Sequence, residues 1–487
     1  MSQTTARLGD GAKRAGQVPR LTREERVTRG KKARAEVPRS SHAEFAPDAD
    51  RPDPVKLLEG EDVSRVPELL PIRYGRMAVS AFTFFRGSAL LMASDLAATP
   101  RTGLTVQICG DAHLSNFGLF ASPERRLVFD MNDFDETLPG PWEWDVKRLA
   151  TSLEVAGRDN GYSTKQRHTI VLAAVAAYRR AMAEFAEKTA LEVWYTHADE
   201  AAVLARFDEA AARSGGKLAR RRKRTSRAMA KARTKDNLGA LGRFAGGQDG
   251  RPQIVADPPL IVPLRDLVED GIDTAELQEQ LRGMLAAYRT TLEPERRVLF
   301  DHYRLVDFAR KVVGVGSVGT RSWMALLLGD DDHDPLFLQA KEAGPSVLEE
   351  FVGPSEYNNA GQRVVVGQRV MQAVSDIFLG WVRVKGIDGQ TRDFYLRQLR
   401  DWKGSAEIEA MIPEGMQAYG ELCGWTLARA HARYGDRIAI SAYLGSGAAF
   451  DVALGEFAQA YADQNEHDYA ALMGAIATGR VAAEPGQ

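Results

Sequence analysis

Residues 110–118 read GDAHLSNFG and lie between two apolar stretches, 104–109 and 126–131, which are typical of short buried strands. Asp111 and Asn116 stand five positions apart on the predicted loop. In phosphoryl transfer, an Asp at such a position orients and deprotonates the acceptor hydroxyl, and the Asn carbonyl binds a magnesium ion. The stretch therefore indicates a catalytic loop held between two strands of a mixed α and β fold.

Acidic residues gather at the end of the second strand. Residues 127–130 run directly into Met-Asn-Asp-Phe-Asp-Glu at 131–136. Carboxylates at the end of a buried strand are costly unless a cation or hydrogen bonds compensate them. Oxygen ligands of this kind suit Mg²⁺, although Asp130 or Asp135 could instead cap turns. The density of acids favours a functional site.

The remaining pattern changes from helical to strand-like and back to helical. Residues 144–188 have helical periodicity with an alanine-rich stretch, strand-like patterns recur between 305 and 399, and helical periodicity returns from 411. The first 60 residues are rich in charged residues and proline, which predicts a disordered or loosely packed segment. This order predicts an α+β protein.

Composition excludes several classes of protein. The chain has 487 residues and a net charge of -2, so it is not a general polyanion binder. Cys109 and Cys423 are too few for a disulfide framework and fit a reducing cytosol. The N-terminus has no apolar run, and no stretch reaches the roughly 18 apolar residues of a membrane helix. We therefore expect a soluble, cytoplasmic protein without membrane contact.

GDAHLSNFG, LVFDMNDFDE and PWEWDVKRLA together resemble the catalytic core of aminoglycoside phosphotransferases and related kinase-like enzymes. The resemblance implies that Asp111 is the base, that Asn116 and Asp133 hold Mg²⁺, and that Asp145 braces the loop. Asp130 is the alternative metal ligand. Cys109 replaces the family's usual histidine and leaves the base intact.

His113 is a further candidate catalytic residue in the same loop, although a lone histidine is more often a structural hydrogen-bonding residue.

A nucleotide-binding half is expected downstream of this core. Gly314, Gly316, Ser317 and Gly319 form a glycine-rich stretch that opens a strand, as in the flap of a kinase. Lys341 ends an apolar run that resembles the strand whose lysine holds the α- and β-phosphates. The acid expected to pair with this lysine lies on the following segment, where the candidates are Glu349, Glu350 and Glu356, with Glu349 preferred.

These halves occur in the reverse of the usual kinase order, which implies a circularly permuted, two-lobed, protein-kinase-like fold. The implied divisions are a loose segment over 1–60, a helical large-lobe portion with the catalytic and metal loops over 61–300, a small antiparallel β-sheet lobe for the nucleotide over 301–402, and a helical part that completes the large lobe over 403–487. The implied ligands are ATP, Mg²⁺ and an unknown hydroxyl-bearing acceptor, either a small molecule or a protein.

Residues 73–468 also resemble a bacterial family designated domain of unknown function 2252. FTFFRGSALLMASDLA, ICGDAHLSNFG, FDMNDFDETLPGPWEWDVKRL and FYLRQLRDWKGS carry this resemblance. The family name implies no activity.

Other functions stay open at this stage. A kinase-like protein can transfer AMP instead of phosphate, or bind ATP as a regulator without turnover. A metal-dependent hydrolase using Asp111, His113 and Asp133 is a third possibility. Residues 217–235 hold ten Lys or Arg without interleaved aromatics, which favours a solvated face or the rim of an anionic-substrate site over nucleic-acid binding. Arg86 is expected either to pair with the acidic loop or to contact phosphate.

Overall fold

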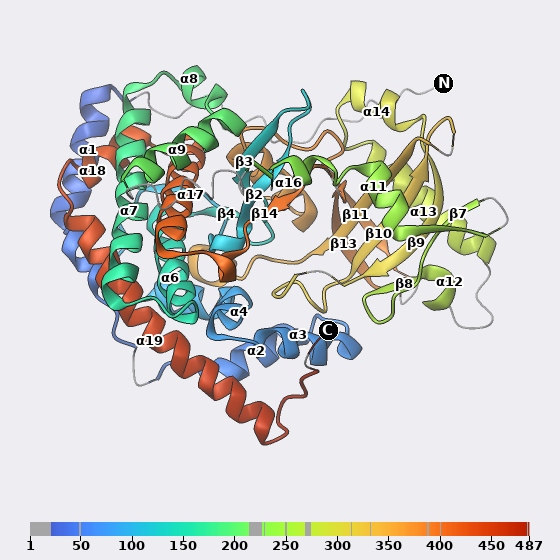
Figure 1. Ribbon diagram of the computed structural model, residues 1–487, viewed down its shortest axis with the longest axis horizontal. Coiled ribbons are helices and arrows are strands. Elements are labelled where there is room, and N and C mark those ends of the chain that lie inside the picture. The colour runs from blue at the N-terminus through green and yellow to red at the C-terminus, as the bar shows by residue number, and fades with distance from the viewer. Residues whose placement is uncertain are drawn as a thin grey trace, which may run out of the picture.

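The computed structural model describes residues 21–47, 50–213, 226–227, 229–248, 251–267, 274–312, 314–331, 333–386, 389–399, 401–484 and 486. Two parts lie side by side in Figure 1, a helical body and a β-rich part. Helix accounts for about 54% of the chain and strand for about 16%, in small antiparallel sheets. The predicted α+β class is therefore confirmed.

Long helices pack together to form the body. Its helices are α1 (Arg23–Glu36), α2 (Pro54–Asp62), α3 (Leu70–Met77), α4 (Ala81–Arg86), α5 (Ala89–Ala97), α6 (Trp142–Asp159), α7 (Thr164–Glu187), α8 (Ala190–Tyr195), α9 (Glu200–Arg213), α17 (Pro413–Tyr434), α18 (Arg437–Leu444) and α19 (Ala449–Ala477). Helix α7 begins at a capping box formed by Ser163 and Gln166. A Cβ on Gly424 would lie 2.3 Å from the Ala174 carbonyl oxygen, so glycine permits the close approach of α17 to α7.

Short strands attach to this body and carry the loop quoted above. Strands β1 (Thr105–Ile108) and β4 (Leu138–Pro141) pair with each other. A second sheet has the strand order β14-β2-β3-β5. Its strands are β2 (Phe117–Ala121), β3 (Leu127–Met131), β5 (Ala198–Asp199) and β14 (Gly404–Ser405). The short 3-10 helix η4 (Leu114–Asn116) precedes β2, and the turn after β3 faces it, because the Asn132 N–H donates to the Asn116 carbonyl.

The β-rich part is built on an antiparallel sheet that has six strands among the described residues, in the order β12-β13-β11-β10-β9-β8. These strands are β8 (Ile261–Pro263), β9 (Arg304–Lys311), β10 (Ser322–Leu328), β11 (Pro335–Ala343), β12 (Gly380–Lys385) and β13 (Thr391–Gln398). The accompanying elements are α11 (Asn237–Phe244), the hairpin of β6 (Ala245–Gln248) and β7 (Arg251–Ile254), α12 (Leu264–Leu267), α13 (Thr274–Arg289), α14 (Pro294–Phe300), α15 (Glu349–Val352) and α16 (Ala360–Met371).

Both faces of this sheet are covered, as the side chains of β10 show. Successive strand residues point to opposite faces. Met324 and Leu326 pack with Phe244 of α11, whereas Ala325 and Leu327 belong to the core that contains residues of α13 and α14. The sheet therefore has a separate apolar core on each side.

Two of the expected divisions differ from the structure. Within residues 21–60, which were expected to be loosely packed, α1 packs against α18 and His42 is buried against Tyr443. Residues 1–20 lie outside the described part. The β-rich part also begins earlier than residue 301, because α11, β8 and α13 contact its sheet. Their apolar residues complete the two cores of the sheet.

No single helix in the described ranges is long and apolar enough to cross a membrane; the pair α18 and α19, bent by 85°, passes that test together on length and composition alone.

A buried lysine in the body makes stability depend on pH. Burial lowers the pKa of Lys147 to about 7 from its ordinary 10.5, against the opposing influence of Glu143 and Glu44. Its Nζ has no hydrogen-bond partner within the described residues and lies 4.4 Å from the centre of the Phe457 ring. Between pH 7 and 10.5 the unfolded chain therefore binds more protons here than the folded protein, so this lysine destabilises less as pH rises.

We expect Lys147→Met to raise the free energy of unfolding by about 2–4 kcal/mol near pH 6, because the buried ammonium is removed. The gain should shrink as pH rises from 7 toward 10.5. Well above pH 10.5 the lysine is neutral in both the folded and the unfolded protein. Urea unfolding followed by circular dichroism at several pH values measures this. Lys165→Met, at an exposed position of α7, is the control; a pH-independent gain at Lys147 would contradict the interpretation.

Candidate functional site

The loop after β1 is fixed from below by one buried carboxylate. Asp145, in the first turn of α6, accepts hydrogen bonds from the backbone N–H groups of Cys109 (2.8 Å) and Gly110 (3.0 Å). His431 Nε2 of α17 lies 3.1 Å from the same side chain. Gly110 has φ +80°, and a Cβ there would lie 2.7 Å from the Glu136 carbonyl oxygen. The predicted bracing role of Asp145 is confirmed.

Asp111 is held more tightly through one carboxylate oxygen than through the other. Arg148 Nε donates to Asp111 Oδ1 at 2.8 Å. The Asn116 side-chain amide donates to the Asp111 carbonyl at 2.9 Å and makes only a long contact of 3.5 Å with Oδ2. The side chain keeps 20% exposure. Burial raises the pKa of Asp111, and Arg148 offsets this only in part. The second oxygen, Oδ2, is therefore the one available to accept a proton.

His113 is buried beside Asp111 and neutral. Burial first, and then the charge of Arg148, lowers its pKa well below the ordinary value. Its Nδ1 accepts from the Ser115 N–H at 3.2 Å, so the proton is on Nε2, which lies 3.6 Å from Asp111 Oδ2. That distance is too long for a hydrogen bond. The histidine thus stabilises the loop and faces the carboxylate without being bonded to it.

Asp133 and Asp135 follow β3 and form a close pair. The Asp135 N–H donates to Asp133 Oδ1 at 3.3 Å. Burial first, and then the neighbouring Asp135, raises the pKa of Asp133. Burial acts most strongly to raise the pKa of Asp135, but Lys341, Tyr395 and Arg397 together outweigh it and lower that pKa. Asp135 is therefore the charged member of the pair, and Asp133 is the carboxylate in need of a cation.

Lys341 on β11 forms an ion pair with Asp135, a residue 206 positions earlier in the chain. Burial alone would lower the pKa of Lys341, but Asp133 and Asp135 raise it, so the lysine stays charged. Tyr395 on the adjacent strand donates its hydroxyl to Asp135 Oδ1 at 2.7 Å. Asp135 is thus matched by two groups on the sheet, the Lys341 ammonium and the Tyr395 hydroxyl.

The structure corrects the expected partner of this lysine. Glu349 does not pair with Lys341; its carboxylate accepts from the Ser346 N–H at 3.0 Å and lies 3.9 Å from Arg363. Arg363 of α16 in turn donates to the carbonyl of Asp135 at 2.7 Å. A helix after the lysine strand thus contributes an arginine that binds the backbone of the acidic turn. The acid that pairs with Lys341 is Asp135 of that turn.

Asp130 lies outside the cavity formed by the other acids. It is 1% exposed, forms an ion pair with the buried Arg429 of α17, and accepts from the Ala373 N–H at 2.9 Å. Every residue of β3 is buried, Asp130 included, whereas Asp133 lies beyond the end of the strand. The structure therefore does not bring Asp130 to the place of a metal ligand.

The glycine-rich stretch, residues 314–319, connects β9 to β10 and closes over Asp135. The Ser317 hydroxyl lies 3.3 Å from Asp135 Oδ2. Arg65 donates to the carbonyls of Gly316 (2.7 Å) and Val318 (2.6 Å). Gly314 and Gly319 have φ of +70° and +92°, a conformation that glycine adopts readily. The turn thus needs its glycines and is held from the outside by arginine.

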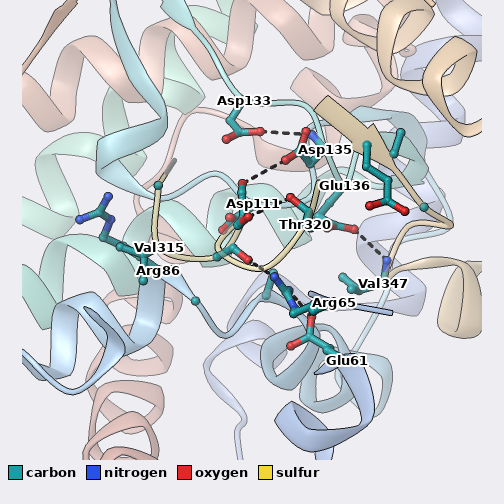
Figure 2. A pocket seen from close by; sticks show the side chains of 18 of the residues that line it. Glu61, Arg65, Arg86, Asp111, Asp133, Asp135, Glu136, Val315, Thr320 and Val347 are labelled. Atoms are coloured by element: carbon teal, nitrogen blue, oxygen red, sulfur yellow. Dashed lines mark hydrogen bonds and ion pairs between the residues drawn. The ribbon is translucent and has the colours of Figure 1, made fainter. Parts of the chain in front are cut away.

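These groups enclose a cavity of about 320 Å³ (Figure 2). Its acidic lining residues are Glu61, Asp111, Asp133, Asp135, Glu136 and Glu342, and its basic ones are Arg65 and Arg86. In Figure 2 the carboxylates of Asp111, Asp133 and Asp135 lie together, with Arg65 and Glu61 beyond the glycine loop. Asn116, Gly314, Gly316 and Ser317 also line this cavity. Gly319 and Lys341 adjoin it through the loop and through Asp135.

The donor atoms of the cavity fit a hard cation. Asn116 and Asp133 offer amide and carboxylate oxygens, which Mg²⁺ prefers. Within the described ranges, no group of three or more His, Cys, Asp or Glu side chains forms a ready metal site. Mg²⁺ commonly uses one or two carboxylates and takes its other ligands from water and phosphate, so a full protein cage is not required.

Three residues of the site received no definite role from the sequence. The sequence leaves Asp135 open between a turn former and a member of the acidic site, and it assigns no role to Arg148 or Arg65. Arg148 follows Asp145 by three positions on α6, a spacing that places both on one helix face. That spacing could have identified Arg148; the contact of Arg65 with a loop 251 residues later has no sequence signal.

A family model described as "Uncharacterized protein conserved in bacteria (DUF2252)" matches residues 65–475. The chain belongs to the DUF2252 family. No curated protein and no solved structure matches the chain. The matched range begins at Arg65 and so includes the loop of residues 110–118, the glycine loop and Lys341. The cavity described above is thus built from DUF2252 sequence throughout, except for Glu61 and Ser64.

Asp130 and Asp133 should differ sharply in their effect on stability. Asp130→Ala leaves Arg429 buried without its carboxylate and should lower the free energy of unfolding by about 3–5 kcal/mol. Asp133→Asn relieves repulsion with Asp135 and should change it by less than about 1 kcal/mol. Urea unfolding of both variants measures the difference. Equal losses would show that both acids are structural.

Proposed function

We propose that this DUF2252 protein is an ATP- and Mg²⁺-dependent phosphotransferase that acts on a hydroxyl-bearing acceptor. The observation that carries the proposal is the meeting of two sequence-distant groups at one cavity. Asp111 and the acidic turn come from the first third of the chain, whereas Lys341 and the glycine loop come from the β-rich part. Phosphoryl transfer needs these parts together: a base, metal-binding oxygens, a lysine and a phosphate-binding loop.

The order of elements in the β-rich part supports a permuted kinase-like arrangement. The glycine loop joins β9 to β10, Lys341 lies on β11 beside β10, and helix α16 follows. A kinase-like nucleotide lobe has the same sequence of glycine loop, lysine strand and helix. Here the catalytic loop comes before this lobe in the chain, as expected for circular permutation.

In the proposed reaction Asp111 accepts the proton of the acceptor hydroxyl on Oδ2, since Arg148 occupies Oδ1. The acceptor oxygen forms a bond to the γ-phosphorus, and the bond from that phosphorus to the β,γ-bridging oxygen breaks, which releases ADP. Lys341 has three N–H donors and can share them between Asp135 and a phosphate oxygen. His113 stays neutral and supports the loop around the base.

The charge of the cavity provides a reason for metal dependence. Six carboxyl side chains line it, so an unaccompanied triphosphate would be repelled. Bound Mg²⁺ would neutralise part of this charge, with Asn116 and Asp133 as its protein ligands. ATP should therefore bind well only together with the metal.

Calorimetric titration of ATP, with and without Mg²⁺, tests the proposal. We expect binding that requires Mg²⁺ and that weakens about tenfold or more in Lys341→Met and in Asp133→Asn, which is about 1.4 kcal/mol or more. Lys385→Ala, at an exposed position of the same sheet, and Glu350→Gln, at an exposed position near the cleft, are matched controls and should bind as the wild type does.

The proposal would be contradicted if ATP failed to bind both the folded wild type and the folded Ala240→Glu variant described below. If ATP binds, the mass added to an acceptor separates phosphoryl transfer from AMP transfer. Binding without any transfer to a broad set of hydroxyl compounds and proteins would favour a nucleotide-binding regulator.

A further inference from the structure

A phosphotransferase must hold two substrates on opposite sides of the transferred group. The following inference rests on the proposed function. The cavity of about 320 Å³ extends from Asp111 toward Arg65 and Arg86. In the other direction along β11, the strand face that carries Lys341 continues past Gln339 to Phe337. A nucleotide with its phosphates at Lys341 has this second direction for its ribose and base.

Residues 229–244 fill that second direction. In Figure 1, α11 lies against β10 and β11. Ala240 and Phe244 of α11 pack against Met324, Leu326 and Phe337, which belong to the face that carries Lys341. This stretch therefore covers the apolar surface of the sheet next to the proposed phosphate site.

The same segment also contacts the helical body. Met229 and Ala232 belong to the body's core. A Cβ on Gly404 would lie 3.2 Å from the Ala232 Cβ and 3.3 Å from the Leu119 Cβ, so Ala232 packs where β14 meets β2. Residues 229–244 thus bridge the two walls of the cleft.

The connection between sheet and body gives this segment a hydrogen bond as well. Trp402 lies two residues before β14, in the connection between β13 and the body. The Trp402 N–H donates to the Lys235 carbonyl at 2.9 Å, and Arg233 lies 5.7 Å from the centre of the Trp402 ring. A backbone donor and an aromatic ring are groups that a nucleoside base could use, and here the chain itself occupies them.

A small cavity of about 80 Å³ is lined by Asn132, the chain neighbour of Asp133. Leu119, Arg397, Asp401 and Lys403 also line it. Pockets that hold small-molecule ligands usually measure about 300–1,000 Å³, so this space is too small for a nucleoside.

We propose that residues 229–244 occupy the subsite for the nucleoside half of the donor and keep the transferase closed until they are displaced. The packing of this segment leaves one polar group unsatisfied, because Asn237 Oδ1 is buried without a hydrogen-bond partner among the described residues. An unsatisfied buried group lowers the cost of displacing the segment. Within this segment, the buried side chains are Met229, Ala232, Ala240 and Phe244. Segments with few buried apolar contacts open at low free-energy cost.

A matched pair of charge substitutions on α11 tests the gate. Ala240 is fully buried against the sheet, so Ala240→Glu should push the helix off. Gly242→Glu adds the same charge at an exposed position where a Cβ meets nothing within 4 Å. We expect Mg²⁺–ATP to bind Ala240→Glu at least about tenfold more tightly than the wild type in calorimetry, and Gly242→Glu to match the wild type.

Amide hydrogen exchange of the wild type provides a second measurement that needs no variant to fold. Addition of Mg²⁺–ATP should speed exchange in residues 229–244 and at Trp402. Equal ATP binding to all three proteins, with exchange in this segment unchanged or slowed, overturns the gate and leaves the phosphotransferase proposal standing. Failure of ATP to bind both the wild type and Ala240→Glu, each shown to be folded, overturns both proposals. Binding by Ala240→Glu alone supports the gate and the nucleotide site together.

Discussion

The ion pair between Lys341 and Asp135 is the interaction on which the candidate site depends. It joins the β-rich part to a turn that belongs to the helical body, across 206 positions of sequence. The Lys341 side chain keeps only 3% exposure, so it needs the nearby carboxylates of Asp133 and Asp135 to stay charged. The glycine loop adds a contact from Ser317 to the same carboxylate, and Tyr395 adds another. One charged pair thereby aligns the loop, the lysine strand and the acidic turn around a common cavity.

The other buried acids are compensated by groups of the body, each in its own way. Asp145 has two backbone donors and a histidine, Asp130 has Arg429, and Asp111 has Arg148 on one oxygen. Asp133 receives only one backbone N–H among the hydrogen bonds of the described residues, and its pKa is raised. This gradation separates acids that stabilise the fold from acids left for a ligand. A carboxylate without a full set of partners, beside a cavity, is the physical mark of a site that binds a cation or a proton.

A cleft between two packed parts can open only if the segments that bridge it are weakly held. Residues 229–244 contact both walls, and Arg65 and Arg76 hold the glycine loop by its carbonyls. The two bridges differ in kind. The arginines donate to fixed backbone acceptors and preserve the loop's shape, whereas the segment covers apolar surface that a planar ligand could cover equally well. On the proposed gate, chain and ligand would exchange over one apolar surface.

The sequence by itself determined the α+β class, the loop with Asp111 and Asn116, the bracing role of Asp145 and membership of the DUF2252 family. These follow from local features: apolar periodicity, residue spacing within one loop and turn, and a match along the chain. The three-residue spacing of Asp145 and Arg148, which places both on one face of α6, is an equally local feature.

Only the tertiary structure decided which acid meets Lys341, that Asp130 is committed to Arg429, and that residues 229–244 pack against both the sheet and the body. It also showed that α11, β8 and α13 belong with the sheet and that α1 is packed. Each of these depends on contacts between residues far apart in the chain. Spacing along a sequence carries no information about such distances, because they are set by how two apolar cores and their buried charges are satisfied together in space.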